Sequence, residues 1–109
     1  MSNLKDIVES AFELRGTSDF NAGDTAVVTA VEEAMAGLDA GTLRVAEKQG
    51  NEWIVNEWLK KAVLLSFMLR QTDVVEGGFT KYFDKVPMKY TDFDAEDFRR
   101  YGARIVPPA

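Results

Sequence analysis

The chain has 109 residues, of which 46% are hydrophobic and 11% aromatic, so it has room for one domain with a modest core. It contains no cysteine and no histidine, which excludes disulfides, thiolate catalysis and a histidine general base, and leaves zinc without its usual ligands. The net charge of −5 argues against nucleic-acid binding, and the longest apolar run, Ala62–Leu69, is too short to cross a bilayer.

Apolar side chains spaced three and four residues apart predict two helices in the N-terminal part of the chain. The first runs from Ser2 to Arg15 and stops at Gly16, and the turn residues of positions 16–23 predict a loop. Asp24 is placed to cap the second helix, and Gly41 to end it. The two apolar stripes consist of Leu4, Ile7, Val8, Ala11 and Phe12, and of Val27 or Val28, Val31, Ala34, Met35 and Leu38.

The next segment alternates between apolar and polar residues around Gln49-Gly50-Asn51, which predicts a β-hairpin with one face on the core. The apolar positions are Leu43, Val45, Trp53 and Val55. We therefore expect Trp53 to pack from the hairpin onto a central helix.

A third helix is predicted from a cap at Asn56 to about Arg70, and its second half is apolar nearly all round, which is typical of a buried central helix. The segment from Phe79 to Tyr90 is ambiguous, because Pro87 excludes a long helix and disfavours a central strand. Asp94 can cap a last short helix that continues through Phe98 to Tyr101 and ends at Gly102. The predicted fold class is thus α+β: a small, mainly helical domain of three to four helices with a β-hairpin.

Several groups could in principle form a site, and each has a simpler structural explanation. Gly77-Gly78 lacks the spacing of a phosphate-binding loop and is predicted to be a plain turn. Glu32 and Glu33 are adjacent on a helix, where successive side chains diverge by about 100°, so they do not face one substrate. For the acids Asp92, Asp94, Glu96 and Asp97, helix capping and solvation explain the pattern better than acid–base catalysis.

The lysines could bind an anion, since Lys81 and Lys85 would share a face if residues 81–86 were helical. Lysine side chains are mostly solvated, however, and we favour this for Lys60, Lys61, Lys81, Lys85 and Lys89. Asp84-Lys85 lies between the aromatic residues Tyr82, Phe83 and Tyr90. We favour a structural loop anchored on the core by these aromatics over a ligand-facing loop.

Three strings of the sequence carry a resemblance to a known family. They are Leu43–Lys48 (LRVAEK), Trp58–Phe67 (WLKKAVLLSF) and Lys81–Ala109 (KYFDKVPMKYTDFDAEDFRRYGARIVPPA). The chain resembles the N-terminal domain of bacterial tetrahydrodipicolinate N-succinyltransferase. The resemblance implies that residues 1–109 are this domain, and that the segment from about residue 103 passes into the family's left-handed β-helix. That β-helix is absent from these residues, which contain no hexapeptide repeat.

The resemblance also implies a function. The family transfers a succinyl group from succinyl-CoA to tetrahydrodipicolinate in the diaminopimelate route to lysine, and works as a cytoplasmic homotrimer with active sites between neighbouring β-helices. The family's arginine at the position of Arg104 binds the dicarboxylate substrate, so Arg104 is the expected site residue. No residue here is expected to be catalytic, to bind a metal or to bind a cofactor, since succinyl-CoA is a co-substrate held by the β-helix.

Two other interpretations stay open at this point. One is a stand-alone binding or interaction domain whose natural chain ends at Ala109. The other is a small independent enzyme that uses carboxylates, lysines and tyrosines, which the lack of a convergent cluster disfavours.

Overall fold

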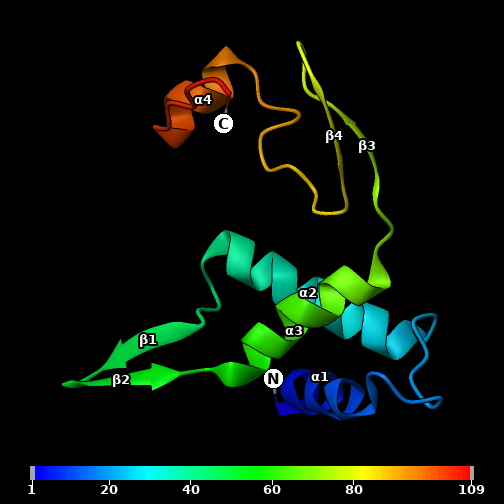
Figure 1. Ribbon diagram of the computed structural model, residues 1–109. Coiled ribbons are helices and arrows are strands. Elements are labelled where there is room, and N and C mark those ends of the chain that lie inside the picture. Colours follow the sequence, from blue (N-terminus) through cyan, green and yellow to red (C-terminus); the bar gives the residue numbers. More distant parts are fainter. Residues whose placement is uncertain (1, 109) are drawn as a thin grey trace.

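Three helices form the body of the molecule in the computed structural model, which describes residues 2–108 (Figure 1). They are α1 (Ser2–Leu14), α2 (Thr25–Ala40) and α3 (Glu57–Leu69), and each packs against the other two. Their predicted apolar stripes meet in one core, whose buried members are Val8, Ala11, Ala30, Val31, Ala34, Leu59, Ala62 and Leu65. Ser66 is also buried, and its hydroxyl donates to the carbonyl of Val63 at 2.6 Å, so that no polar atom is left unpaired there.

The ends of α2 follow from local chemistry, as predicted. The Asp24 side chain accepts a hydrogen bond from the Ala26 N–H at 3.0 Å, which satisfies one of the free donors of the first turn. Gly41 ends the helix with a φ of 81°, which is a left-handed backbone conformation that residues other than glycine rarely adopt. The predicted second helix and both of its boundary residues are therefore confirmed.

The first hairpin consists of β1 (Ala46–Gln49) and β2 (Glu52–Val55), and it projects away from the helices (Figure 1). The hairpin was predicted, but its packing was not: Trp53 is 66% exposed and Val55 60% exposed. The register pairs Trp53 with Lys48, and these side chains share an open face, whereas Ile54 on the other face is half-buried. The expected packing of Trp53 onto the central helix is thus wrong.

The third helix is central, but only one side of it is covered. Leu59, Ala62 and Leu65 face α1 and α2, whereas Leu64, Phe67 and Met68 are each about 40% exposed. The prediction of burial nearly all round is wrong because two neighbouring helices leave the remaining side of α3 to solvent. Asn56 does precede the helix, but its side-chain amide donates to the carbonyl of Arg44 at 2.7 Å and closes the base of the first hairpin instead of capping α3.

A second hairpin, β3 (Asp73–Glu76) with β4 (Lys81–Asp84), lies where the sequence was ambiguous, and Gly77-Gly78 forms its turn as predicted. Its aromatic side chains are not anchored on the core: Tyr82 is 39% exposed and Phe83 is 72% exposed. That expectation fails because the hairpin extends away from the three-helix body, and the core ends at α3 (Figure 1). Most apolar side chains of the hairpin are consequently exposed to solvent.

The last helix, α4 (Ala95–Tyr101), lies apart from the other helices and agrees with the prediction in position and length. The Cα radius of gyration is 16.7 Å, compared with about 13 Å for a compact domain of this size, and the extents are 42 × 41 × 19 Å. The chain is thus a three-helix body with an open C-terminal part, and the α+β fold class with its helix-rich composition is confirmed. Among residues 2–108, no helix is long and apolar enough to span a membrane.

Candidate functional site

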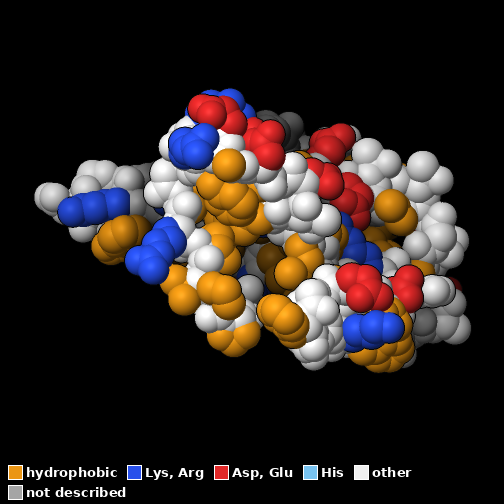
Figure 2. All heavy atoms as spheres, turned by 90° about the horizontal axis from the view of Figure 1, so that it is seen from above, with side chains coloured by type: hydrophobic (Ala, Val, Ile, Leu, Met, Phe, Trp, Pro, Cys, Tyr) orange, Lys and Arg blue, Asp and Glu red, His pale blue; other side chains and the backbone are white. Residues whose placement is uncertain are grey.

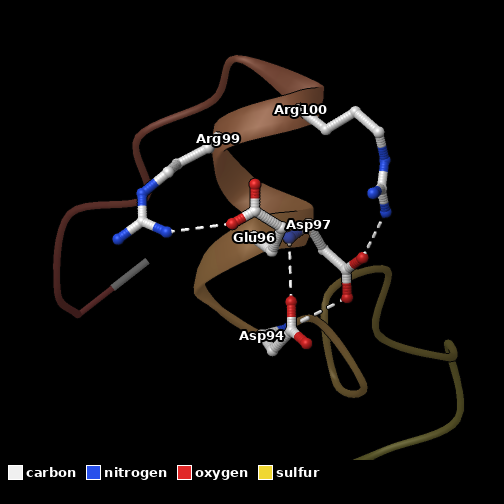
Figure 3. Close-up of polar contacts among 5 residues, drawn as sticks. All are labelled: Asp94, Glu96, Asp97, Arg99 and Arg100. Atoms are coloured by element: carbon white, nitrogen blue, oxygen red, sulfur yellow. Dashed lines mark hydrogen bonds and ion pairs between the residues drawn. The ribbon is translucent and has the colours of Figure 1, made fainter.

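The start of α4 explains three of the acidic residues of the C-terminal segment (Figure 3). The Asp94 side chain accepts from the Asp97 N–H at 2.8 Å, and the Asp97 side chain accepts from the Asp94 N–H at 3.1 Å, which forms a reciprocal capping box. Glu96 pairs with Arg99 at 3.1 Å, and Asp97 also pairs with Arg100. Capping and ion pairing therefore account for Asp94, Glu96 and Asp97, but not for Asp92, which lines a small cavity together with Asp97.

Four aromatic side chains pack around α4 and form a small cluster of their own. Tyr90 lies within 5.8 Å, centroid to centroid, of each of its ring neighbours, which are Phe93, Phe98 and Tyr101. Burial against these rings, followed by the effect of Tyr101, raises the pKa of Tyr90 above the ordinary value of a phenol. The cluster gives α4 an apolar support that is separate from the main core.

Lys89 connects this cluster to the helical body. Its Nζ donates to Oδ1 of Asp39 near the end of α2, and it also lies 5.6 Å from the ring centroid of Tyr101. The hydrogen bond to Asp39 raises the pKa of Lys89; burial opposes this rise, and Tyr101 makes a smaller contribution in the same direction as Asp39. Lys89 is thus a charged structural link, and sequence patterns could not have revealed a partner that lies 50 positions away.

The lysine series does not converge on an anion site. Lys81 pairs with Glu76 at 3.7 Å, whereas the Lys85 Nζ donates to the carbonyl of Phe67 at 2.8 Å. Lys85 therefore forms a second link between the C-terminal part and α3. Because residues 81–84 form a strand, the shared helical face considered for Lys81 and Lys85 does not exist.

Arg104 follows α4 in a segment without regular secondary structure, from Ala103 to Val106, and its side chain is exposed. Arg99 and Arg100 are bound to carboxylates of their own helix, but within residues 2–108 Arg104 has neither an ion pair nor a hydrogen bond. A guanidinium in this state presents its planar fork of donors to solvent, where it can take a carboxylate in two parallel hydrogen bonds.

A cavity in the helical body, by contrast, has no cluster of charged side chains among the described residues that line it. It has a volume of about 650 Å³ and lies between α1 and α2, and Glu33 is its single acidic residue. Glu32 points elsewhere and pairs with Arg70 at 2.9 Å, which confirms that the two glutamates diverge. In the described part of the chain, no group of three or more acidic side chains is placed to hold a metal ion. Arg104 remains the candidate.

Comparison with known proteins shows which family the chain resembles. Residues 3–69 match the family model described as Tetrahydrodipicolinate N-succinyltransferase N-terminal. All 109 residues align with proteins named 2,3,4,5-tetrahydropyridine-2,6-dicarboxylate N-succinyltransferase, at 56% identity in Nitrosococcus oceani, 54% in Thioalkalivibrio sulfidiphilus and 52% in Alkalilimnicola ehrlichii. The chain spans 40% of the length of each of these relatives. The segment with Arg104 lies outside the residues matched by the family model, but it lies inside the alignments with these relatives, which cover the whole of this chain.

Proposed function

The chain belongs to the tetrahydrodipicolinate N-succinyltransferase N-terminal family, and from this membership we propose that it is the N-terminal domain of an acyltransferase acting in diaminopimelate and lysine biosynthesis. The reaction is the transfer of succinyl from succinyl-CoA to tetrahydrodipicolinate, the dicarboxylate that the relatives' names contain. The observation that carries the proposal is the alignment of every residue at up to 56% identity with proteins of that name.

The chemistry of the reaction indicates which tasks belong to this domain and which to the rest of the longer protein. The ring nitrogen of tetrahydrodipicolinate is an imine, so water must add to it before there is an amine to acylate. That amine loses a proton as it attacks the thioester carbonyl and coenzyme A leaves, which requires a base and a positioned donor. Within residues 2–108, Asp94, Glu96 and Asp97 are engaged in capping and ion pairs, so none of these three is offered as the base. We assign acid–base chemistry and succinyl-CoA binding to the part of the longer protein that follows, and substrate-side contact and structural support to this domain.

Arg104 is the proposed substrate contact. Tetrahydrodipicolinate carries two carboxylates, and a site for it needs fixed cationic donors more than apolar area. The side chain is exposed, and it lies at the end of the domain next to Ile105 and Val106, which are 41% and 55% exposed. Apolar residues at such a boundary are suited to contact a following domain, which we propose to be the left-handed β-helix of a homotrimeric, cytoplasmic enzyme.

Steady-state kinetics of the full-length protein test the role of Arg104. A hydrogen bond to a charged group contributes about 1.5–3 kcal/mol, so Arg104→Ala should lower kcat/KM for the dicarboxylate by roughly 10- to 150-fold. The KM for succinyl-CoA should change little. Arg104→Lys should restore part of the loss, because lysine keeps the charge but not the planar fork.

Arg99→Ala is the matched control, since Arg99 is an exposed arginine only five positions away that is engaged with Glu96. Wild-type kinetics for both Arg104 variants would refute the substrate contact while leaving the family assignment in place. Residues 1–109 alone should release no coenzyme A from succinyl-CoA above background. Turnover close to that of the full-length protein would show that this domain holds the catalytic groups after all.

A further inference from the structure

A cavity of about 360 Å³ lies beside the second hairpin, away from the three-helix core. Its walls come from the hairpin, from the loop that follows β4, and from Pro108 near the end of the chain. The lining is mainly apolar and consists of Val75, Gly77, Tyr82, Asp84, Val86, Pro87, Met88 and Pro108. From the side of the second hairpin and α4, hydrophobic side chains are exposed over a wide area around a hollow (Figure 2).

The register of the hairpin separates its two faces. Val75 pairs with Tyr82, and both line the cavity, whereas the neighbouring pair Val74 and Phe83 points to the opposite face. The Tyr82 ring lies so close to the turn that a Cβ on Gly77 would clash with its Cε2 atom, and both residues line the cavity. Two-stranded hairpins are marginally stable alone, so a face built in this way gains from being covered.

The course of the chain suggests one occupant for the cavity. Pro108 already lines the cavity, so the described part of the chain ends at this place. The relatives extend well beyond the aligned region, which makes up 40% of their length. A segment tethered next to a cavity has an effective concentration on the order of millimolar, which favours it over a partner from solution.

We propose that this cavity binds the residues that directly follow Ala109 in the longer protein, and that the second hairpin is thereby the docking element between this domain and the next. The inference rests on the longer chain in the proposed function. It also gives the hairpin a role in the site: the segment with Arg104 is held at one end by α4 and at the other by the cavity. A segment fixed at both ends loses less freedom when its arginine binds a ligand.

Photo-crosslinking in the full-length protein tests the occupant directly. The probe is p-benzoyl-phenylalanine incorporated in place of Met88, which lines the cavity and is 53% exposed, so the larger side chain has room. After illumination, mass spectrometry of the digest should show an intramolecular crosslink to the peptide that directly follows Ala109. The same probe in place of Phe83, on the opposite face, should not give this crosslink.

Each alternative outcome is distinct. A crosslink from position 88 to a second copy, or to a part of the chain remote from Ala109, would overturn the proposal, as would equal crosslinking from positions 83 and 88. If the protein with the probe at position 88 fails to fold, Val86, which lines the same cavity and is 44% exposed, takes the probe under the same criteria. Crosslinking needs no turnover, so a protein that crosslinks as expected but transfers no succinyl group would refute the proposed function and leave the docking element standing.

Discussion

Replacing Leu65 by alanine should destabilise the domain strongly, because this leucine is completely buried at the contact of the three helices. Moving the lost carbon atoms back into water accounts for about 2 kcal/mol, and the unfilled space raises the expected loss to about 3–4 kcal/mol. Since domains are stable by only about 5–15 kcal/mol, this is a large share of the total. At a urea dependence of about 1–3 kcal/mol/M, the unfolding midpoint should fall by roughly 1–4 M.

The adjacent Leu64 provides the control for this experiment. It lies on the same helix and has the same intrinsic helix propensity, but it is 39% exposed on the uncovered side of α3. Leu64→Ala should therefore cost no more than about 1 kcal/mol. Urea unfolding of residues 1–109, followed by circular dichroism at constant m-value, measures both variants. Equal losses for the two leucines, or a loss below about 1 kcal/mol for Leu65→Ala, would mean that α3 presents a different face to the core.

Three further predictions concern the hairpin and the C-terminal part. Trp53→Ala should cost less than about 2 kcal/mol in urea unfolding, because only about a third of this side chain is covered; a loss of about 3–5 kcal/mol would indicate a buried tryptophan. Asp94→Ala removes the capping box and should destabilise α4 by about 1 kcal/mol, seen as faster amide exchange in residues 95–101, whereas unchanged rates would contradict the cap. The raised pKa of Lys89 means that its link to Asp39 contributes stability below the ordinary lysine pKa of 10.5 and loses it as pH rises through the raised value. NMR shifts near Asp39 should report this alkaline step in the wild type and not in Lys89→Gln; a step common to both would assign it to another group.

Local signals predicted the parts of the fold that depend on neighbouring residues. Asp24 and Gly41 delimit α2, and Asp94 and Gly102 delimit α4, because a capping side chain and a left-handed glycine act within one helical turn. The apolar spacing of α1 and α2 likewise identified the core. These features need no knowledge of the rest of the molecule.

The errors share a different physical cause. Alternation around Trp53 predicted a hairpin correctly, but alternation cannot say whether another element covers the apolar face. In the second hairpin, Val74-Val75 and Tyr82-Phe83 are consecutive apolar pairs without clear alternation, so the strands were missed. Each error concerns a surface whose cover lies far away in the sequence, or outside these residues.

The candidate site was even less accessible to pattern reasoning. Nothing in the composition or spacing distinguishes Arg104 from a solvated arginine, and it was selected only through the resemblance of the surrounding string. Its lack of a partner within residues 2–108 is a three-dimensional fact, as is the pairing of Lys89 with Asp39. Long-range ion pairs depend on how the elements meet, which a single sequence does not encode locally.

The projecting first hairpin has a spectroscopic consequence. The domain contains two tryptophans, and they differ sharply in environment: Trp53 stands on the open face of the hairpin, whereas Trp58 is half-buried against the core at the start of α3. Acrylamide should quench the fluorescence of Trp53 first, and its emission should be red-shifted relative to that of Trp58. A single fluorescence experiment can therefore follow the hairpin and the helical body separately. The quenchable emission of Trp53 reports binding to the hairpin. The protected emission of Trp58 reports the unfolding of the core.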